Sequence, residues 1–99
     1  MKLYYVYIVE CSDNSFYIGV SSNLEKRLEQ HNIGIKKDVY TYSRRPVTLK
    51  WVEVFTDPQK AITVEKQIKG WSRRKKIALI EANWDKLVLY SKNYAEYGK

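Results

Sequence analysis

Two short runs of strand-forming residues at the start of the chain, joined by a cluster of turn formers, constrain the fold more than any other feature. Residues 3–11 (LYYVYIVEC) and 16–20 (FYIGV) are rich in β-branched and aromatic side chains, which suit a pleated, half-buried surface. Residues 12–15 between them (SDNS) all favour tight turns. The chain is therefore predicted to begin with a β-hairpin.

A helix and a third strand are predicted after the hairpin. Ser22 with Glu25 three residues later matches a capping box, in which each side chain satisfies a backbone N–H at the start of a helix that ends at Gly34. Residues 35–46 show no period and are predicted to form a loop. The next segment alternates as a strand does, and its apolar positions are Val47, Leu49, Trp51 or Val52, and Val54, within residues 47–55.

Two further helices complete the predicted order. Asp57-Pro58 combines a capping residue with proline at the first helical position, so a helix is expected from here to about Lys69. Ser72 can cap a last helix over residues 73–82. The order β-β-α-β-α-α predicts an α+β fold in which helices cover a short sheet.

The length of the chain and its net charge indicate how many domains it forms and which kind of partner it binds. With 99 residues the chain is expected to be a single domain, 1–99, with a core over about residues 3–90 and a mobile C-terminal tail. Eighteen Lys and Arg against eleven Asp and Glu give a formal net charge of +7. Such a surplus in a small domain favours polyanionic partners, with nucleic acid first and an anionic membrane second.

Cysteine usage and hydropathy indicate a compartment. Cys11 is the only cysteine, which excludes an intrachain disulfide. The first residues lack the apolar run of a signal peptide, and no segment is long and apolar enough to span a bilayer. The protein is therefore expected to be cytoplasmic.

Three polar side chains fall on helix faces that also carry apolar residues. Glu65 lies within the apolar side of residues 61–68, where an ionised carboxylate is costly unless it is paired or metal-bound. Pairing with Lys69, four residues on, is the simpler alternative. Arg27 and His31 share a helix face, so together they could supply a fixed cation and a titratable group, although each alone is more often a surface or structural residue.

Three of the nine tyrosines, Tyr5, Tyr7 and Tyr17, lie in a recognisable pair of tripeptides. Tyrosine in a strand ordinarily packs with its hydroxyl in water. However, Tyr5-Val6-Tyr7 on the first strand and Tyr17-Ile18-Gly19 on the second resemble the two motifs that name the GIY-YIG nuclease family. The resemblance covers roughly residues 3–90, is closest to a small standalone bacterial branch, and includes VSSNLEKRL (20–28), His31-Asn32 and EKQIK (65–69).

The resemblance implies a fold, a reaction and a role for each matched residue. The fold would be a small three-stranded antiparallel sheet flanked by helices, and the reaction metal-dependent hydrolysis of phosphodiester bonds in nucleic acid, with DNA favoured over RNA. Tyr7 would help deprotonate the attacking water, and Tyr17 would orient that water or contact the scissile phosphate. Arg27 would offset charge on the phosphate, and His31 would accept a proton or bind phosphate. Glu65 would bind one divalent ion, expected to be Mg²⁺, which needs only one or two protein carboxylates.

A basic run on the last two predicted helices is a candidate surface for the phosphate backbone: Lys66, Lys69, Arg73, Arg74, Lys75 and Lys76. The same run could be a solvated helical face. Asn83 is a further candidate, for the asparagine that the family often carries near the end of its catalytic module. Nothing resembles a zinc finger or a recognition helix, so low intrinsic sequence specificity is expected.

Two alternatives stay open beside the nuclease. Tyr5 adds a large side chain where the first motif of the family has glycine, which favours a non-catalytic module that binds nucleic acid through the same tyrosines and basic surface. The other alternative is a subunit that recruits another enzyme to nucleic acid, although the sequence indicates no protein partner. A membrane-surface role is not expected, because no helix joins a basic face to a broad apolar one.

Overall fold

The computed structural model describes residues 2–34 and 40–82. The elements are β1 (Tyr4–Glu10), β2 (Phe16–Ser21), α1 (Leu24–Ile33), the 3₁₀ helix η1 (Tyr42–Arg44), β3 (Thr48–Phe55), α2 (Pro58–Lys69) and α3 (Arg73–Ile80). This order confirms the predicted α+β fold. The chain forms two compact units, residues 1–69 and 70–99. The single domain stays a prediction, and the predicted mobile tail lies outside the described residues.

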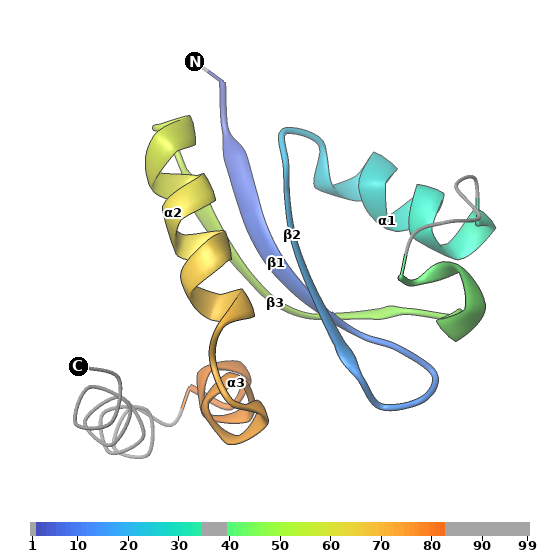
Figure 1. Cartoon of the computed structure of the whole chain (residues 1–99). Helices are drawn as coiled ribbons and strands as arrows, with labels where there is room; N and C mark the ends of the chain where they lie inside the picture. Colours follow the sequence, from blue (N-terminus) through green and yellow to red (C-terminus); the bar gives the residue numbers. More distant parts are fainter. Residues whose placement is uncertain (1, 35–39, 83–99) are drawn as a thin grey trace. The chain divides into compact units, whose positions relative to one another are not determined.

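The three strands form one antiparallel sheet in the order β2-β1-β3, with α2 on one side of it and α1 on the other (Figure 1). Side chains alternate between the faces of a strand, so β1 supplies both layers of the core. Val6 and Ile8 are fully buried on the side of α2, which contacts all three strands. Tyr7 and Val9 are fully buried on the other side, in a cluster against which the apolar residues of α1 pack.

The hairpin turn is held by its own polar groups. The backbone N–H of Cys11 donates to the carbonyl of Ser15 at 2.8 Å. Asp13 accepts hydrogen bonds from both the backbone N–H and the hydroxyl of Ser15. Asn14 has a φ of 67°, a left-handed conformation that asparagine tolerates better than most residues. The turn chemistry read from the sequence is thus the chemistry that closes the hairpin.

Helix α1 begins one residue later than the predicted capping box requires. Its N-cap is Asn23, whose side chain accepts a hydrogen bond from the backbone N–H of Lys26 at 3.1 Å. The Ser21 hydroxyl bonds both backbone groups of Asn23 and so fixes that residue in an extended conformation before the helix. Ser22 is exposed and does not cap. The predicted end is confirmed, because Gly34 adopts a φ of 77° as the C-cap.

The end of α1 is tied to the chain just before β3. Asn32 accepts a hydrogen bond from the N–H of Val47 at 2.8 Å and donates one to its carbonyl at 3.3 Å. Arg45 donates to the carbonyl of Ile33 at the last turn of the helix. These bonds place α1 against the sheet, so they also position every side chain that α1 directs towards it.

Strand β3 departs from the predicted alternation. Its register with β1 shifts between Ile8 and Val9, because Trp51 pairs with Ile8 while Leu49 pairs with Val9. The extra residue is a β-bulge, which changes the side chains that face each layer. Val52 and Val54, both predicted to be on the packed side, are instead 37% and 48% exposed.

The two C-terminal helices start as predicted. Asp57 accepts a hydrogen bond from the N–H of Gln59 at the start of α2, and Ser72 caps α3 by accepting one from the N–H of Lys75. Helix α3 ends at Ile80 and not at residue 82, because Ala82 has a φ of 54° and turns the chain out of the helix. No helix within residues 2–34 and 40–82 has the length and apolar character to cross a membrane.

Candidate active site

The hydroxyl of Tyr7 is the centre of the candidate site. Tyr7 belongs to the central strand and its side chain is completely buried. Gly19 faces it across the β1–β2 pair, and a side chain at position 19 would collide with the Tyr7 hydroxyl. The glycine of the second predicted motif therefore makes room for the tyrosine of the first.

His31 joins Tyr7 to a residue that the sequence analysis missed. It lies in the last turn of α1 and is only 7% exposed. Its Nε2 is 2.9 Å from the Tyr7 hydroxyl, and its Nδ1 is 2.8 Å from the Thr41 hydroxyl. Thr41 is fully buried. Tyr7, His31 and Thr41 thus form one hydrogen-bonded row in which both nitrogens of the imidazole have partners.

Burial and neighbouring charges set the protonation of this row. Desolvation raises the pKa of Tyr7 to about 12; Tyr17 and Glu65 add to the rise, while Arg27 opposes it through its charge and hydrogen bonding. Burial, and then the positive charge of Arg27, lower the pKa of His31. At neutral pH the tyrosine therefore keeps its proton and the imidazole is uncharged.

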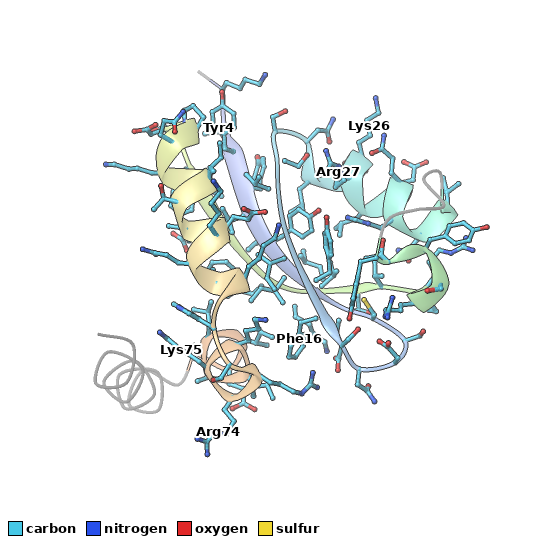
Figure 2. The ribbon with its side chains drawn as sticks, in the orientation of Figure 1. Tyr4, Phe16, Lys26, Arg27, Arg74 and Lys75 are labelled. Carbon is cyan, nitrogen blue, oxygen red and sulfur yellow. The ribbon has the colours of Figure 1, made fainter. Side chains whose placement is uncertain are left out.

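Arg27 and Tyr17 flank the row and are only partly buried. Arg27 lies one turn before His31 on the side of α1 next to the strands, whereas Lys26 extends into solvent (Figure 2). The Tyr17 ring packs edge-on against His31, with centroids 5.2 Å apart, and lies 6.5 Å from the Tyr7 ring. Both residues therefore reach the row and the solvent at the same time, as groups that bind a substrate must.

Glu65 reaches the same place from α2. The residue is 9% exposed, and its carboxylate forms an ion pair with the Lys69 ammonium at 2.7 Å. The pairing considered from the sequence is therefore confirmed. The carboxylate also lies close enough to Tyr7 for its charge to raise the pKa of that hydroxyl. Of the predicted catalytic residues, His31 lies within hydrogen-bond distance of the Tyr7 hydroxyl, Tyr17 packs against His31, and the charges of Arg27 and Glu65 both act on Tyr7.

The donor set around Glu65 suits one class of metal. Among the described residues, no group of three or more His, Cys, Asp and Glu is placed to hold a metal ion. A single buried carboxylate cannot provide the three or four ligands of a zinc site. It does fit Mg²⁺, which takes its remaining oxygens from water and substrate. The metal stays a prediction, with Glu65 as its protein ligand.

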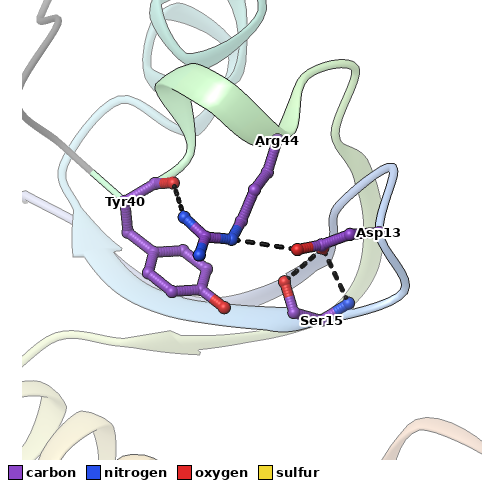
Figure 3. A network of polar contacts seen from close by, with 4 residues as sticks. All are labelled: Asp13, Ser15, Tyr40 and Arg44. Carbon is purple, nitrogen blue, oxygen red and sulfur yellow. Dashed lines mark hydrogen bonds and ion pairs between the residues drawn. The ribbon is translucent and has the colours of Figure 1, made fainter.

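The segment before η1 buttresses the site from the side of the hairpin. Tyr40 stacks on Tyr17 with centroids 6.2 Å apart, and Thr41, its neighbour, binds His31. The Arg44 guanidinium lies 3.9 Å from the centre of the Tyr40 ring, donates to the Tyr40 carbonyl, and forms an ion pair with Asp13 at 3.0 Å (Figure 3). The hairpin turn is therefore connected to both aromatic and polar parts of the site.

Tyr40 and Thr41 lie in a stretch whose sequence has no period, so no pattern indicated their role. Their only signal is local: aromatic and basic residues alternate with hydroxyl residues in YTYSRR (40–45). That composition is typical of binding loops and also of ordinary exposed loops. Tyr40 and Thr41 belong to the site because they contact Tyr17 of the hairpin and His31 of α1, which are distant in sequence.

The predicted basic run is divided between the two units. Lys66 and Lys69 are exposed on α2, and Arg73 and Arg74 are exposed on α3. Lys75 differs, since it is 6% exposed, its ammonium lies 4.0 Å from the centre of the Trp71 ring, and burial lowers its pKa. Contact of the run with nucleic acid stays a prediction. Asn83 lies outside the described residues.

Comparisons with known proteins agree with this geometry. The sequence profile of the GIY-YIG catalytic domain matches residues 3–78. A UPF0213 protein of Staphylococcus haemolyticus is 46% identical over 81 residues, which are 82% of this chain and 98% of that protein. One from Syntrophus aciditrophicus is 44% identical over 87 residues, covering 88% and 100%. The solution structure of a UPF0213 protein from Bacillus halodurans is 36% identical with a TM-score of 0.54, covering 81% of this chain and 84% of the other.

Proposed function

The chain belongs to the family of GIY-YIG catalytic domains, a nuclease-type family, and on that premise we propose that it hydrolyses phosphodiester bonds in nucleic acid with the help of a divalent metal ion. DNA is the favoured substrate and intrinsic sequence specificity is low. The observation that carries the proposal is the hydrogen bond between His31 and the Tyr7 hydroxyl, on which the charges of Arg27 and Glu65 also act.

The Tyr7–His31 pair acts as a proton relay. With a pKa of about 12, Tyr7 is not a free phenolate at neutral pH. Because Tyr7 is fully buried, the step requires the side chains that cover it to move aside when substrate and water bind. The Tyr7 hydroxyl then accepts a proton from the attacking water while its own proton passes to Nε2 of His31, which its lowered pKa keeps neutral and able to accept. The resulting hydroxide attacks phosphorus, the bond to the leaving oxygen breaks, and solvent protonates that oxygen. Thr41 holds the imidazole in the orientation this transfer needs.

The partly buried residues bind the substrate phosphate. Arg27 carries a positive charge on a planar guanidinium that matches two phosphate oxygens. The Tyr17 hydroxyl orients the water or contacts the same phosphate, with its ring held between His31 and Tyr40. These contacts offset the charge that develops as the phosphate reaches its transition state.

Glu65 is the residue that would hold the metal. A Mg²⁺ ion bound there would polarise the phosphate and stabilise the leaving oxygen. Lys69 already pairs with the carboxylate, so it compensates the burial of Glu65 before any cation binds. The lysine would have to move aside or share the carboxylate when the site is loaded.

A panel of labelled single-stranded, duplex, flap and RNA substrates, with Mg²⁺, Mn²⁺ or EDTA, tests the proposal. Wild-type protein is expected to cut at least one substrate only with metal, and Glu65→Gln and Arg27→Ala are expected to lose cleavage while remaining folded. Lys26→Ala is the matched control for Arg27→Ala, because it removes one positive charge from the exposed side of the same helix. Equal cleavage by wild type and Glu65→Gln would overturn the assignment.

One observation favours the non-catalytic alternative. The Glu65 carboxylate already has a cationic partner in Lys69, so the site is electrostatically complete without metal. A module that only binds nucleic acid would retain affinity in EDTA and cut nothing in the panel. A recruiting subunit would bind nucleic acid weakly and would be recovered with a partner enzyme.

A further inference from the structure

A groove beside the candidate site has no role in the chemistry described so far. Its volume is about 260 Å³, and it is lined by Tyr4 of β1, Val20 and Ser21 of β2, Arg27 of α1, and Pro58 and Ile62 of α2. Arg27 therefore lines both the groove and the catalytic row. Whatever occupies the groove would lie directly next to the phosphate that Arg27 binds.

The lining divides into an apolar part and a polar end. Val20, Pro58 and Ile62 provide aliphatic surface, and Ile62 is 37% exposed. Tyr4 adds an aromatic ring, with the Lys2 ammonium 6.0 Å from the ring centre. Ser21 uses its hydroxyl on the backbone of Asn23, and the exposed Ser22 adds a second hydroxyl to the lining. Arg27 is the one charged group among the lining residues.

This pattern matches one nucleotide unit of a nucleic acid. A nucleobase has flat apolar faces that stack on aromatic rings, and its phosphate carries the negative charge that Arg27 would meet. Stacking requires access to one face of a base, and within a duplex the neighbouring bases cover both faces. A base that enters the groove must therefore be unpaired, at an end, or turned out of the helix.

We propose that the groove between Tyr4 and Ile62 binds the unpaired base next to the scissile phosphate. The inference rests on the proposed function and sharpens it, because it makes single strands, flaps and junctions with an unstacked base the preferred substrates. Tyr4 stacks on the base, Ile62 and Val20 support its edge, and Arg27 sets the distance between base and phosphate. Lys2 lies beside the ring, where it can contact the next phosphate.

The test separates base binding from cleavage. Affinity for a short single-stranded oligonucleotide, and for the same oligonucleotide with one abasic position, is measured in EDTA with Glu65→Gln protein, so no cutting interferes. Moving the abasic position along the strand is expected to reveal one position where loss of the base weakens binding by about 5-fold or more, the lower bound for one stacked base. In NMR titrations, the chemical-shift changes that the intact strand causes at Val20 and Ile62 should be absent with the oligonucleotide that lacks this one base.

Three variants complete the design. Tyr4→Phe keeps the ring and is expected to bind like the parent. Tyr4→Leu removes it and should bind intact and abasic strands equally. Ile62→Gln adds a polar group without charge to the groove from an exposed position and should weaken binding of the intact strand more than of the abasic strand. This variant tests the groove if Tyr4→Leu fails to fold. The proposed base-binding role of the groove is overturned if no abasic position weakens binding. It is also overturned if Tyr4→Leu protein still binds the intact strand more tightly than the abasic strand. If the wild-type groove binds a base but the protein cuts no substrate, the proposed nuclease activity is overturned and the groove is not.

Discussion

The Thr41 hydroxyl lies 2.8 Å from Nδ1 of His31, on the opposite side of the imidazole from the Tyr7 hydroxyl, which is 2.9 Å from Nε2. Thr41 is fully buried, so water does not compete for this bond. Threonine therefore orients the ring and leaves Nε2 for the tyrosine.

Two replacements of Thr41 should distinguish the contribution of its hydrogen bond from that of its side-chain volume. Thr41→Val keeps the volume but leaves Nδ1 of a buried imidazole without a partner, which is expected to lower the free energy of unfolding by about 1–3 kcal/mol. Thr41→Ser keeps the hydroxyl, so its free energy of unfolding should fall much less. Urea denaturation measures both values. Cleavage should fall in Thr41→Val and persist in Thr41→Ser, and equal behaviour of the two variants would contradict the role of the hydroxyl.

Protonation of His31 should destabilise the fold. Its pKa is lowered from 6.5 by burial and by Arg27, so the folded chain binds fewer protons than the unfolded chain in this range. The stabilisation from the neutral ring is present above pH 6.5 and is lost as pH falls from there towards the lowered value. Denaturation midpoints at constant ionic strength should therefore decrease below about pH 6.5. His31→Gln should flatten this segment of the curve, and an unchanged slope in that variant would exclude His31 as its source.

Gly19→Ala should be destabilising through Tyr7. The added methyl would overlap the tyrosine hydroxyl, and overpacking of this type costs about 1–3 kcal/mol. Tyr7→Phe removes the nearest atom, so the cost of Gly19→Ala should be smaller in that background. A double-mutant cycle of unfolding free energies tests the coupling. Additive effects would show that the two residues do not meet.

Asn32→Ala should loosen the connection between α1 and β3. The variant loses two hydrogen bonds to the backbone of Val47, and about 1–2 kcal/mol of stability is expected to go with them. Asn32→Asp keeps an acceptor for the N–H but sets an oxygen against the carbonyl, so it should not restore stability. Amide hydrogen exchange at Val47 provides a local measurement, and protection equal to that of the wild type would contradict the prediction.

Sequence patterns predicted the secondary-structure elements well for a definite physical reason, while the catalytic roles stay predictions. Strand alternation, turn residues and helix caps are local, and the spacing of Arg27 and His31 fixes a shared helix face. The motif residues Tyr7 and Gly19 pair across two neighbouring strands of a hairpin, so their contact also follows from short-range structure. The resemblance then added Glu65, which local reasoning would have treated as half of an ion pair with Lys69.

Features that depend on distant contacts could not be predicted. The bulge opposite Ile8 and Val9 exposed two valines of β3, and bulges leave no mark in the alternation of a single strand. Thr41 and Tyr40 acquire their contacts only when the segment before η1 packs against His31 and Tyr17. The partners in each case come from elsewhere in the chain.

The groups that meet at Tyr7 arrive from four separate pieces of the chain, namely the hairpin, α1, the segment before η1, and α2 on the opposite side of the sheet. Local opening of any one of them would pull a needed group away from the hydroxyl. An intermediate with part of the fold intact would therefore have no residual activity. Loss of activity in denaturant should track the cooperative unfolding of residues 1–69 and should not precede it.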